Sequence, residues 1–157
     1  MRDAACATIA TPFGLAYYIE ASDGAIAYGS FRRTKTLTRG IRHPLLREVA
    51  AQIKAYFRGR LRRFDVPLQL EGTPLQRAAW EAIYELEFGH FVSYADVARA
   101  IGKPHAHRAI AAAMVKTPID LLIPAHRVLG SDGRIKGAGA RSMRARLVRF
   151  ENPDYSL

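Results

Sequence analysis

One stretch of the chain, LLIPAHRVLGSDG (121–133), combines residue types that do chemistry with a turn that could present them. An apolar run ends at Pro124, and His126 and Arg127 follow just before a polar turn that is bounded by glycines. Histidine exchanges protons near neutral pH, and arginine binds anions. This combination is typical of the edge of an active site. The residue between Pro124 and His126, however, is Ala125, which has no reactive atom.

The composition narrows the classes of function. Hydrophobic residues make up 49% of the 157 residues, which suits one packed domain or two small lobes with a shared core. The single cysteine, Cys6, excludes an internal disulfide and a zinc site that needs several thiolates, so we expect neither metal nor cofactor. The chain has no apolar run of transmembrane length, and its first residues do not resemble a signal peptide. We therefore expect a cytoplasmic protein.

The charge points to a polyanionic partner. The formal net charge is +10, and the basic residues gather in 31–43, 57–64 and 127–149. Nucleic acid is the first candidate for a partner of such a chain, although a role in solubility alone is the alternative.

The first half of the sequence predicts a small mixed lobe over residues 1–70. Two strands are expected at 11–21 and 24–31, joined by a turn at Ser22-Asp23-Gly24. Pro44 should then open a helix that Gly59 ends. The segment 64–72 is expected to be an extended connector at the boundary between the lobes.

The second half, residues 71–157, predicts a helical lobe. Thr73-Pro74-Leu75-Gln76 is a capping box, a second helix should begin at Ser93 and stop at Gly102, and a third is expected over 104–115. Helix, glycine-containing turn and helix together are typical of a helix-turn-helix. The overall expectation is a mixed α/β (α+β) fold with a winged-helix-like second lobe.

The third of these helices is unusual because nearly all of its faces carry small residues. Its alanines leave little side-chain bulk beyond Arg108 and Met114, and they are Ala106, Ala109, Ala111, Ala112 and Ala113. Tight helix packing is one explanation, but it needs only one stripe of small residues. Small residues on nearly every face leave an exposed face flat, which favours close approach to a narrow groove.

Four segments carry a resemblance to a known family, the O6-alkylguanine-DNA alkyltransferases, also called methylated-DNA–protein-cysteine methyltransferases. They occur in family order and spacing, and they are GTPLQRAAWEAI, FVSYADVARAIGKP, HRAIAAAM and LLIPAHRV. The resemblance covers most of the chain and is strongest from Gly72 to Val128. It implies a mixed N-terminal lobe, followed by a lobe whose helix-turn-helix binds the DNA minor groove and turns the damaged guanine out of the duplex.

The resemblance also assigns expected roles to single residues. Arg108 matches the arginine that fills the gap left by the flipped base, and Tyr94 matches the tyrosine that crowds the backbone of the target nucleotide. His126 and Glu151 match the residues that, with a water, deprotonate the nucleophilic cysteine. The remaining positions expected to contact DNA or the lesion are Ala106, Ala111, Ala112, Met114, Ala125, Val128 and Ala138.

Several positions depart from the family pattern. Ala125 stands where the family has its nucleophilic cysteine, and a methyl group cannot attack an alkyl carbon. Ala138 replaces a pocket tyrosine, and Thr117 replaces an asparagine that braces the active-site turn. Cys6 lies before the first predicted strand and has no histidine partner in sequence, so it is not expected to substitute. Without a cysteine to serve, His126 is expected to be a core histidine satisfied by Glu151, while Arg127 forms a structural salt bridge.

These departures resemble the cysteine-less alkyltransferase-like branch of the family. The prediction is therefore that the chain is not an enzyme. It would be a monomeric sensor that binds O6-alkylguanine in double-stranded DNA, tolerates bulky alkyl groups, and flags the lesion for nucleotide excision repair. Two alternatives stay open. One is an active-type methyltransferase that carries an engineered Cys→Ala change, and the other is a helix-turn-helix transcription regulator.

Overall fold

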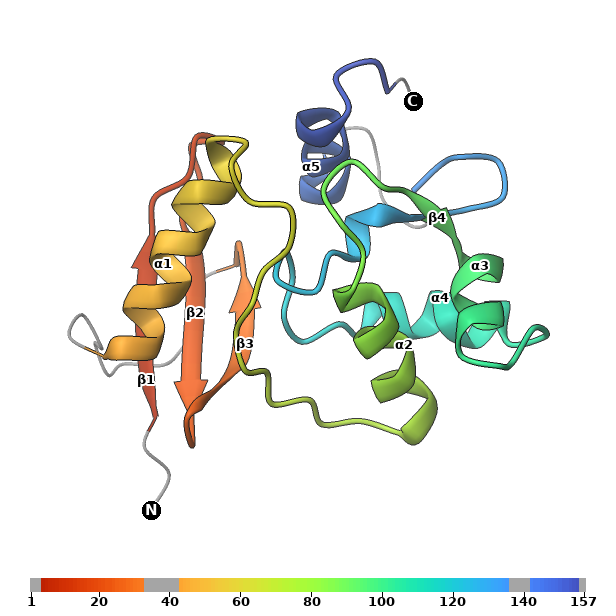
Figure 1. Cartoon of the computed structure of the whole chain (residues 1–157), viewed down its shortest axis with the longest axis horizontal. Helices are drawn as coiled ribbons and strands as arrows, with labels where there is room; N and C mark the ends of the chain where they lie inside the picture. The colour runs from red at the N-terminus through yellow and green to blue at the C-terminus, as the bar shows by residue number, and fades with distance from the viewer. Residues whose placement is uncertain (1–3, 33–42, 136–141, 156–157) are drawn as a thin grey trace. The chain divides into compact units, whose positions relative to one another are not determined.

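The computed structural model describes residues 4–32, 43–135 and 142–155. Contacts divide the chain into two units. Unit 1 comprises Met1–Leu70 and Pro118–Leu122, and unit 2 comprises Glu71–Thr117 and Ile123–Leu157. Small sheets and helices occur in both, so the predicted mixed α/β fold class is confirmed (Figure 1).

Unit 1 is built on a three-stranded antiparallel sheet in the order β1-β2-β3. The strands are β1 (Ala5–Ile9), β2 (Tyr17–Ser22) and β3 (Ala25–Ser30). The hairpin between β2 and β3 turns at Asp23 and Gly24, whose φ angles are 54° and 79°. Two consecutive positive φ angles match the twist of antiparallel strands, which is why a turn at Asp-Gly could be predicted from sequence.

The sequence-based prediction of the strands was wrong in two places. Strand β1 was missed, and Cys6 lies inside it rather than before the first strand. The strand expected at 11–21 begins only at Tyr17. Residues 11–16 instead form the turn between β1 and β2, where Gly14 has a φ of 77° that interrupts an extended chain.

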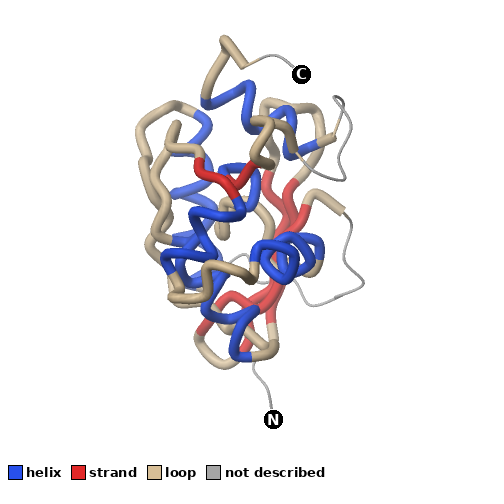
Figure 2. Tube along the Cα trace, turned by 90° about the vertical axis from the view of Figure 1, so that its right-hand side faces the viewer, coloured by secondary structure: helices blue, strands red, loops and turns tan. Residues whose placement is uncertain are grey.

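Helix α1 (Pro44–Phe57) supplies the apolar layer against this sheet, and it contacts β1 and β2 (Figure 1). Figure 2 distinguishes the helices, in blue, from the strands, in red. Its buried residues, at helical spacing, are Leu46, Val49, Ile53 and Tyr56. Pro44 opens the helix as predicted, and Gly59, with a φ of 70°, follows its C-cap residue Arg58.

Two segments that are distant in sequence add to β3. Ile26 exchanges backbone hydrogen bonds with Pro67 and Gln69, both 2.8 Å long, and pairs in parallel with Leu68. Gly29 pairs in parallel with Ile119, and its carbonyl accepts from the Asp120 amide at 2.8 Å. The second pairing is the reason why residues 118–122 belong to unit 1.

Unit 2 is mainly helical. Its helices are α2 (Pro74–Tyr84), α3 (Tyr94–Ala100), α4 (His107–Val115) and α5 (Met143–Glu151), and a short parallel pair joins β4 (Val92–Ser93) to β5 (Val128–Leu129). The predicted capping box at Thr73 and Gln76 is confirmed, and Ser93 and Asp96 form a second one at the start of α3. Helices α3 and α4 contact each other across the turn 101–106.

The predicted start of α4 was wrong by three residues. Pro104 lies in the turn, and the helix begins at His107 with Ala106 as its N-cap residue. Gly102 has a φ of 74°, and the Ala106 amide donates to the Lys103 carbonyl at 2.9 Å, so the chain is still turning at Pro104. Along the described residues, no helix has the length and apolar character needed to cross a membrane.

Candidate functional site

The turn that first suggested an active site is a 3-10 turn (Ala125–Arg127) that leads directly into β5. The Arg127 amide donates to the Pro124 carbonyl at 2.9 Å, and the Ala125 amide donates to the Ile123 carbonyl at 2.7 Å. The segment is fully buried from residue 121 to residue 128. The proline and the apolar run therefore fix a rigid, enclosed turn rather than a solvent-exposed edge.

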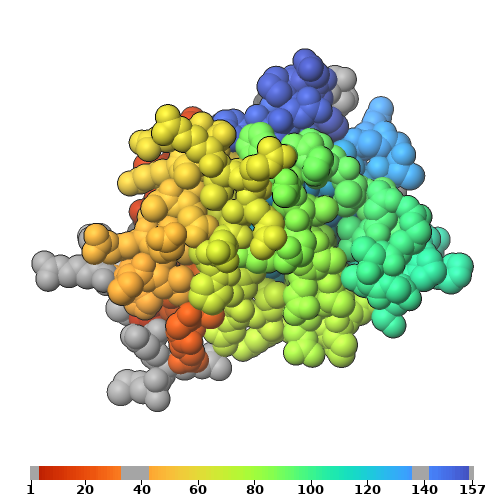
Figure 3. All heavy atoms as spheres, viewed as in Figure 1, coloured from red at the N-terminus to blue at the C-terminus, as the bar shows by residue number. Residues whose placement is uncertain are grey.

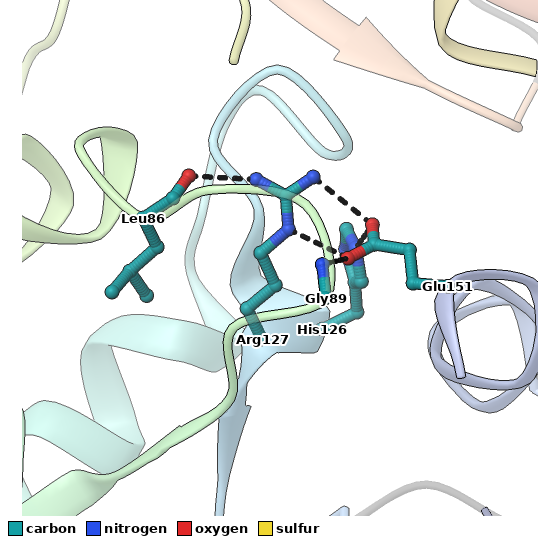
Figure 4. Close-up of polar contacts among 5 residues, drawn as sticks. All are labelled: Leu86, Gly89, His126, Arg127 and Glu151. Atoms are coloured by element: carbon teal, nitrogen blue, oxygen red, sulfur yellow. Dashed lines mark hydrogen bonds and ion pairs between the residues drawn. The ribbon is translucent and has the colours of Figure 1, made fainter. Parts of the chain in front are cut away.

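Three charged or titratable side chains meet at this turn: His126 and Arg127 from the turn itself, and Glu151, the last residue of α5 (Figure 4). The Glu151 carboxylate accepts from Arg127 through Nε at 2.9 Å and Nη2 at 3.0 Å. His126 Nε2 lies 2.5 Å from Oε2 of the same carboxylate. The Gly89 amide donates to its Oε1 at 2.9 Å, and the third guanidinium contact runs from Arg127 Nη1 to the Leu86 carbonyl at 2.7 Å.

This cluster sets the protonation state of its members. Burial by itself would raise the pKa of Glu151, but the hydrogen bonds and positive charge of its neighbours outweigh burial and hold that pKa well below its usual range. Burial, together with the positive charges of Arg127 and Arg144, holds the pKa of His126 below its usual value, although contact with Glu151 acts in the opposite direction. A guanidinium group is charged at any physiological pH. At neutral pH the cluster is therefore an arginine–carboxylate ion pair beside a neutral imidazole.

The geometry defines which imidazole nitrogen can act as a base. Because the ionised Glu151 accepts a hydrogen bond from Nε2, the proton of the neutral ring is on Nε2, and Nδ1 carries the lone pair. A carboxylate that orients an imidazole in this way is the usual support of a general base. Such a base could deprotonate a thiol at the neighbouring position, but residue 125 is alanine.

Helix α4 presents a nearly flat exposed face. Arg108, Ala109 and Ala112 are exposed, and Val115 has 79% of its surface accessible. Arg108, Ala112 and Val115 follow the i, i+4, i+7 spacing of a single helix face. The apolar residues Ile110 and Met114 are buried, whereas Ala106 and Ala111 are half-buried. In Figure 3 the turn before α4, in blue-green, lies at the surface.

The last turn of α4 is held by three side chains. Trp80 Nε1 donates to the Ala113 carbonyl at 3.0 Å, and Thr117 Oγ1 donates to the Met114 carbonyl at 3.0 Å. Arg144 Nη2, from α5, donates to the same Met114 carbonyl at 2.6 Å. Carbonyls at a helix C-terminus lack partners inside the helix, so these bonds fix the end of α4.

Sequence reasoning missed this arrangement. In sequence, Arg144 is one of many basic residues in 127–149, and Thr117 stands at the position of an asparagine that braces the active-site turn. The hydroxyl of Thr117 instead bonds to helix carbonyls three and four residues earlier. The only signal in sequence was a threonine before Pro118, which is typical of a helix end.

The other expected site residues are also in unit 2. Tyr94, Met114, Ala125 and Val128 are buried. Because Ser93 pairs with Leu129 in the β4–β5 ladder, Tyr94 at the start of α3 follows the strand that adjoins Val128. Ala138 lies outside the described residues.

Comparison with known proteins identifies relatives with a named activity. The chain is 46% identical over 91 residues to a methylated-DNA–protein-cysteine methyltransferase of Methanosarcina barkeri, which is 58% of each chain. It is 36% identical over 114 residues to the constitutive enzyme of that name from Bacillus subtilis, covering 71% of this chain and 69% of the relative. The chain thus spans little more than half the length of the first of these relatives. A crystal structure of Mycobacterium tuberculosis OGT in complex with DNA matches with a TM-score of 0.81 and 30% identity, over 94% of this chain and 92% of that one.

These relatives contradict the prediction that the chain is not an enzyme. They are named for methyl transfer to a protein cysteine, whereas that prediction rested on departures from the family pattern at Ala125, Ala138 and Thr117. Similarity to these named enzymes covers 58% and 71% of the chain, so the prediction of a non-enzyme does not stand.

The family itself is established by its DNA-binding half. Residues 74–152, half of the chain, match the family model described as "6-O-methylguanine DNA methyltransferase, DNA binding domain". This segment contains α2 to α5, the buried His126–Glu151 pair and the exposed face of α4. The resemblance recognised in the sequence is thereby confirmed, and the chain belongs to the O6-methylguanine-DNA methyltransferase family.

Proposed function

We propose that this chain binds O6-alkylguanine in double-stranded DNA, with α4 in the minor groove and the damaged base turned out of the duplex. The observation that carries the proposal is the exposed face of α4, where Arg108 stands among alanines. Family membership and the DNA complex of the Mycobacterium tuberculosis relative support DNA as the partner.

The dimensions of the groove favour this helix. The minor groove of B-DNA is only about 6 Å wide, so bulky side chains would keep a helix backbone away from it. Ala109 and Ala112 leave the backbone free to approach, and the larger Arg108 can enter the stack where a base has left it. Filling that gap repays part of the unstacking energy, which is a few kcal/mol for a flipped base.

Four residues are assigned to the lesion in this proposal. Tyr94 would turn the backbone of the target nucleotide, while Met114, Ala125 and Val128 would line the space that receives the base. Residue 125 carries only a methyl group, so any alkyl transfer by this chain needs an acceptor other than residue 125. A small residue there also leaves room for O6-alkyl groups larger than methyl.

A titration on matched duplexes tests the proposal. One duplex carries a single O6-methylguanine and the other carries guanine, and fluorescence anisotropy with the full chain gives both dissociation constants. A damaged pair opens more easily than a normal pair, so we expect a preference of roughly tenfold or more for the lesion, which corresponds to about 1.4 kcal/mol. Equal affinity for both duplexes contradicts the proposal, and a preferred undamaged sequence would favour a helix-turn-helix regulator instead.

Two variants separate base flipping from charge. Arg108→Ala should reduce the preference for the lesion, because the gap in the stack is then unfilled. Lys103→Ala removes an exposed charge from the turn before α4 and should weaken both complexes equally. Equal effects of the two variants on the lesion preference would exclude the proposed role of Arg108.

The same duplex, with a radiolabelled methyl group, measures what happens to the lesion after binding. Label that moves to the protein identifies an acceptor residue, which peptide mapping would locate. We also propose that nucleotide excision repair proteins act on the bound lesion, and label that stays on the DNA would support this.

A further inference from the structure

The loop that follows α1 carries a set of exposed arginines on a backbone that is anchored at both ends. We define the arginine loop as residues 58–63, which contain four exposed arginines: Arg58, Arg60, Arg62 and Arg63. Lys54, in the last turn of α1, is also exposed, and no acidic residue occurs from 54 to 64. The nearest acid in sequence is Asp65.

The start of the loop is fixed by the end of α1. The Gly59 amide donates to the Tyr56 carbonyl at 2.9 Å, and the Arg60 amide donates to the Ala55 carbonyl at 2.9 Å. These two bonds form a Schellman motif, in which Gly59 takes the left-handed conformation that other residues rarely adopt. The backbone at Arg58 and Arg60 is therefore held by the end of the helix.

The end of the loop is fixed by packing and by one glutamine. Phe64 is buried, and its ring centroid lies 5.6 Å from that of Tyr56. Gln52 of α1 donates through Nε2 to the Asp65 carbonyl at 3.0 Å and accepts from the Asp65 amide at 2.9 Å. Six residues rich in arginine thus run between two anchored ends, so little chain entropy is lost when they bind a ligand.

We propose that the arginine loop binds backbone phosphates of double-stranded DNA, independently of any lesion. Guanidinium groups match phosphate oxygens in a two-pronged geometry, and DNA offers a negative charge about every 1.7 Å along its axis. A membrane surface is a poorer match, because interfacial segments also bury large apolar side chains. Among the described residues, the large apolar side chains that are exposed are Leu15 and Val115, and neither is in the loop.

This inference goes beyond the proposed function, although it rests on DNA as the partner. The face of α4 is assigned to lesion preference, whereas the arginine loop is assigned to affinity for any duplex. The two proposals can therefore be refuted separately. The proposed function is tested by the ratio of the affinities for damaged and undamaged DNA, and the arginine loop by the salt dependence of binding to undamaged DNA.

The test compares two double variants of the full chain that have equal net charge. Arg60→Ala/Arg63→Ala removes two loop arginines, and Arg47→Ala/Arg77→Ala removes two exposed arginines outside the loop. Each phosphate contact contributes about 0.9 to the slope of log affinity against log salt concentration, so the loop variant should lower that slope by about 1.8 on an undamaged duplex. The matched control should change the slope much less, and the lesion preference should be the same in both.

Three results would overturn the proposal. The loop variant could keep the wild-type slope, or both double variants could lower the slope equally, which would mean that only total charge matters. In the third, phosphatidylserine-containing vesicles would bind the wild type but not the loop variant, while the loop variant keeps the wild-type salt dependence of DNA binding. Urea unfolding serves as the control for folding. Midpoints of both variants equal to that of the wild type ensure that a smaller salt slope reflects lost phosphate contacts.

Discussion

The buried carboxylate of Glu151 gives the sharpest prediction for the stability of this protein. Glu151→Gln keeps the shape of the side chain but removes the charge that faces Arg127, whose exposed fraction is 1%. An arginine side chain does not deprotonate, so its charge would remain buried without a counter-ion. The guanidinium would then be buried with only the Leu86 carbonyl and one amide oxygen as acceptors.

The expected magnitude follows from that stranded charge. Removing one partner of a buried ion pair costs about 3–5 kcal/mol, a large part of the roughly 5–15 kcal/mol that stabilises a typical domain. For a chain of this size the melting temperature should fall by roughly 6–20 °C. Replacement of both charges, as in Arg127→Met/Glu151→Leu, should cost less than the sum of the two single variants, because no charge is left unpaired.

Urea unfolding followed by circular dichroism measures these free energies. The control is Glu81→Gln, an exposed carboxylate on α2, which should change the stability by no more than about 0.5 kcal/mol. If Glu151→Gln costs less than about 1 kcal/mol, or if the double variant is as unstable as the sum of the singles, the cluster does not act as a buried ion pair.

Three further predictions concern pH, the turn at residue 125 and the sheet of unit 1. The pKa values of His126 and Glu151 are lower in the folded than in the unfolded chain. The free energy of unfolding should therefore be largest above about pH 6.5 and should decrease as the pH falls. Protonation of His126 should cause the first decrease, and protonation of Glu151 should add to it below about pH 4.5. Urea titrations from neutral to acidic pH check this, and a constant stability between pH 7 and 5 would contradict it. Ala125→Cys puts a thiol on the residue next to His126, whose Nδ1 carries the lone pair, so this variant should take up a radiolabelled methyl group from O6-methylguanine DNA at residue 125. Ala125→Ser should not. A thiol variant that binds the lesion without being labelled at residue 125 would show that His126 is not positioned as its base. Gly29→Ala should destabilise the protein by about 1–3 kcal/mol, because the new methyl group would overlap the Tyr17 hydroxyl, and an unchanged unfolding midpoint would contradict this.

The parts of the fold that sequence predicted well depend on interactions between near neighbours. The capping box of Thr73 and Gln76 closes within one helical turn, and the Asp23-Gly24 hairpin needs only two residues with positive φ. The buried stripe of α1 follows from apolar spacing alone. Each of these is decided by chemistry within about four residues, so the sequence pattern is sufficient.

The errors occurred where local preference is weak and distant partners decide. The residues of β1 have no strong pattern of their own, and they are held as a strand by pairing with β2. Residues 118–122 follow a helix in sequence but pair with β3 through Gly29. The start of α4 depends on the turn closed by the hydrogen bond from the Ala106 amide to the Lys103 carbonyl. The presence of Pro104 alone does not predict that bond.

The sequence by itself determined the family, the mixed fold class, most helix boundaries and the absence of a reactive group at residue 125. Only the tertiary structure decided that Glu151 is shared by His126, Arg127 and the Gly89 amide, and that Arg144 and Trp80 hold the end of α4. Helix caps and hairpin turns are specified by a few consecutive residues. A buried carboxylate and a helix end obtain their partners from segments 24 to 62 residues away, and only the packing of the whole unit brings those groups together.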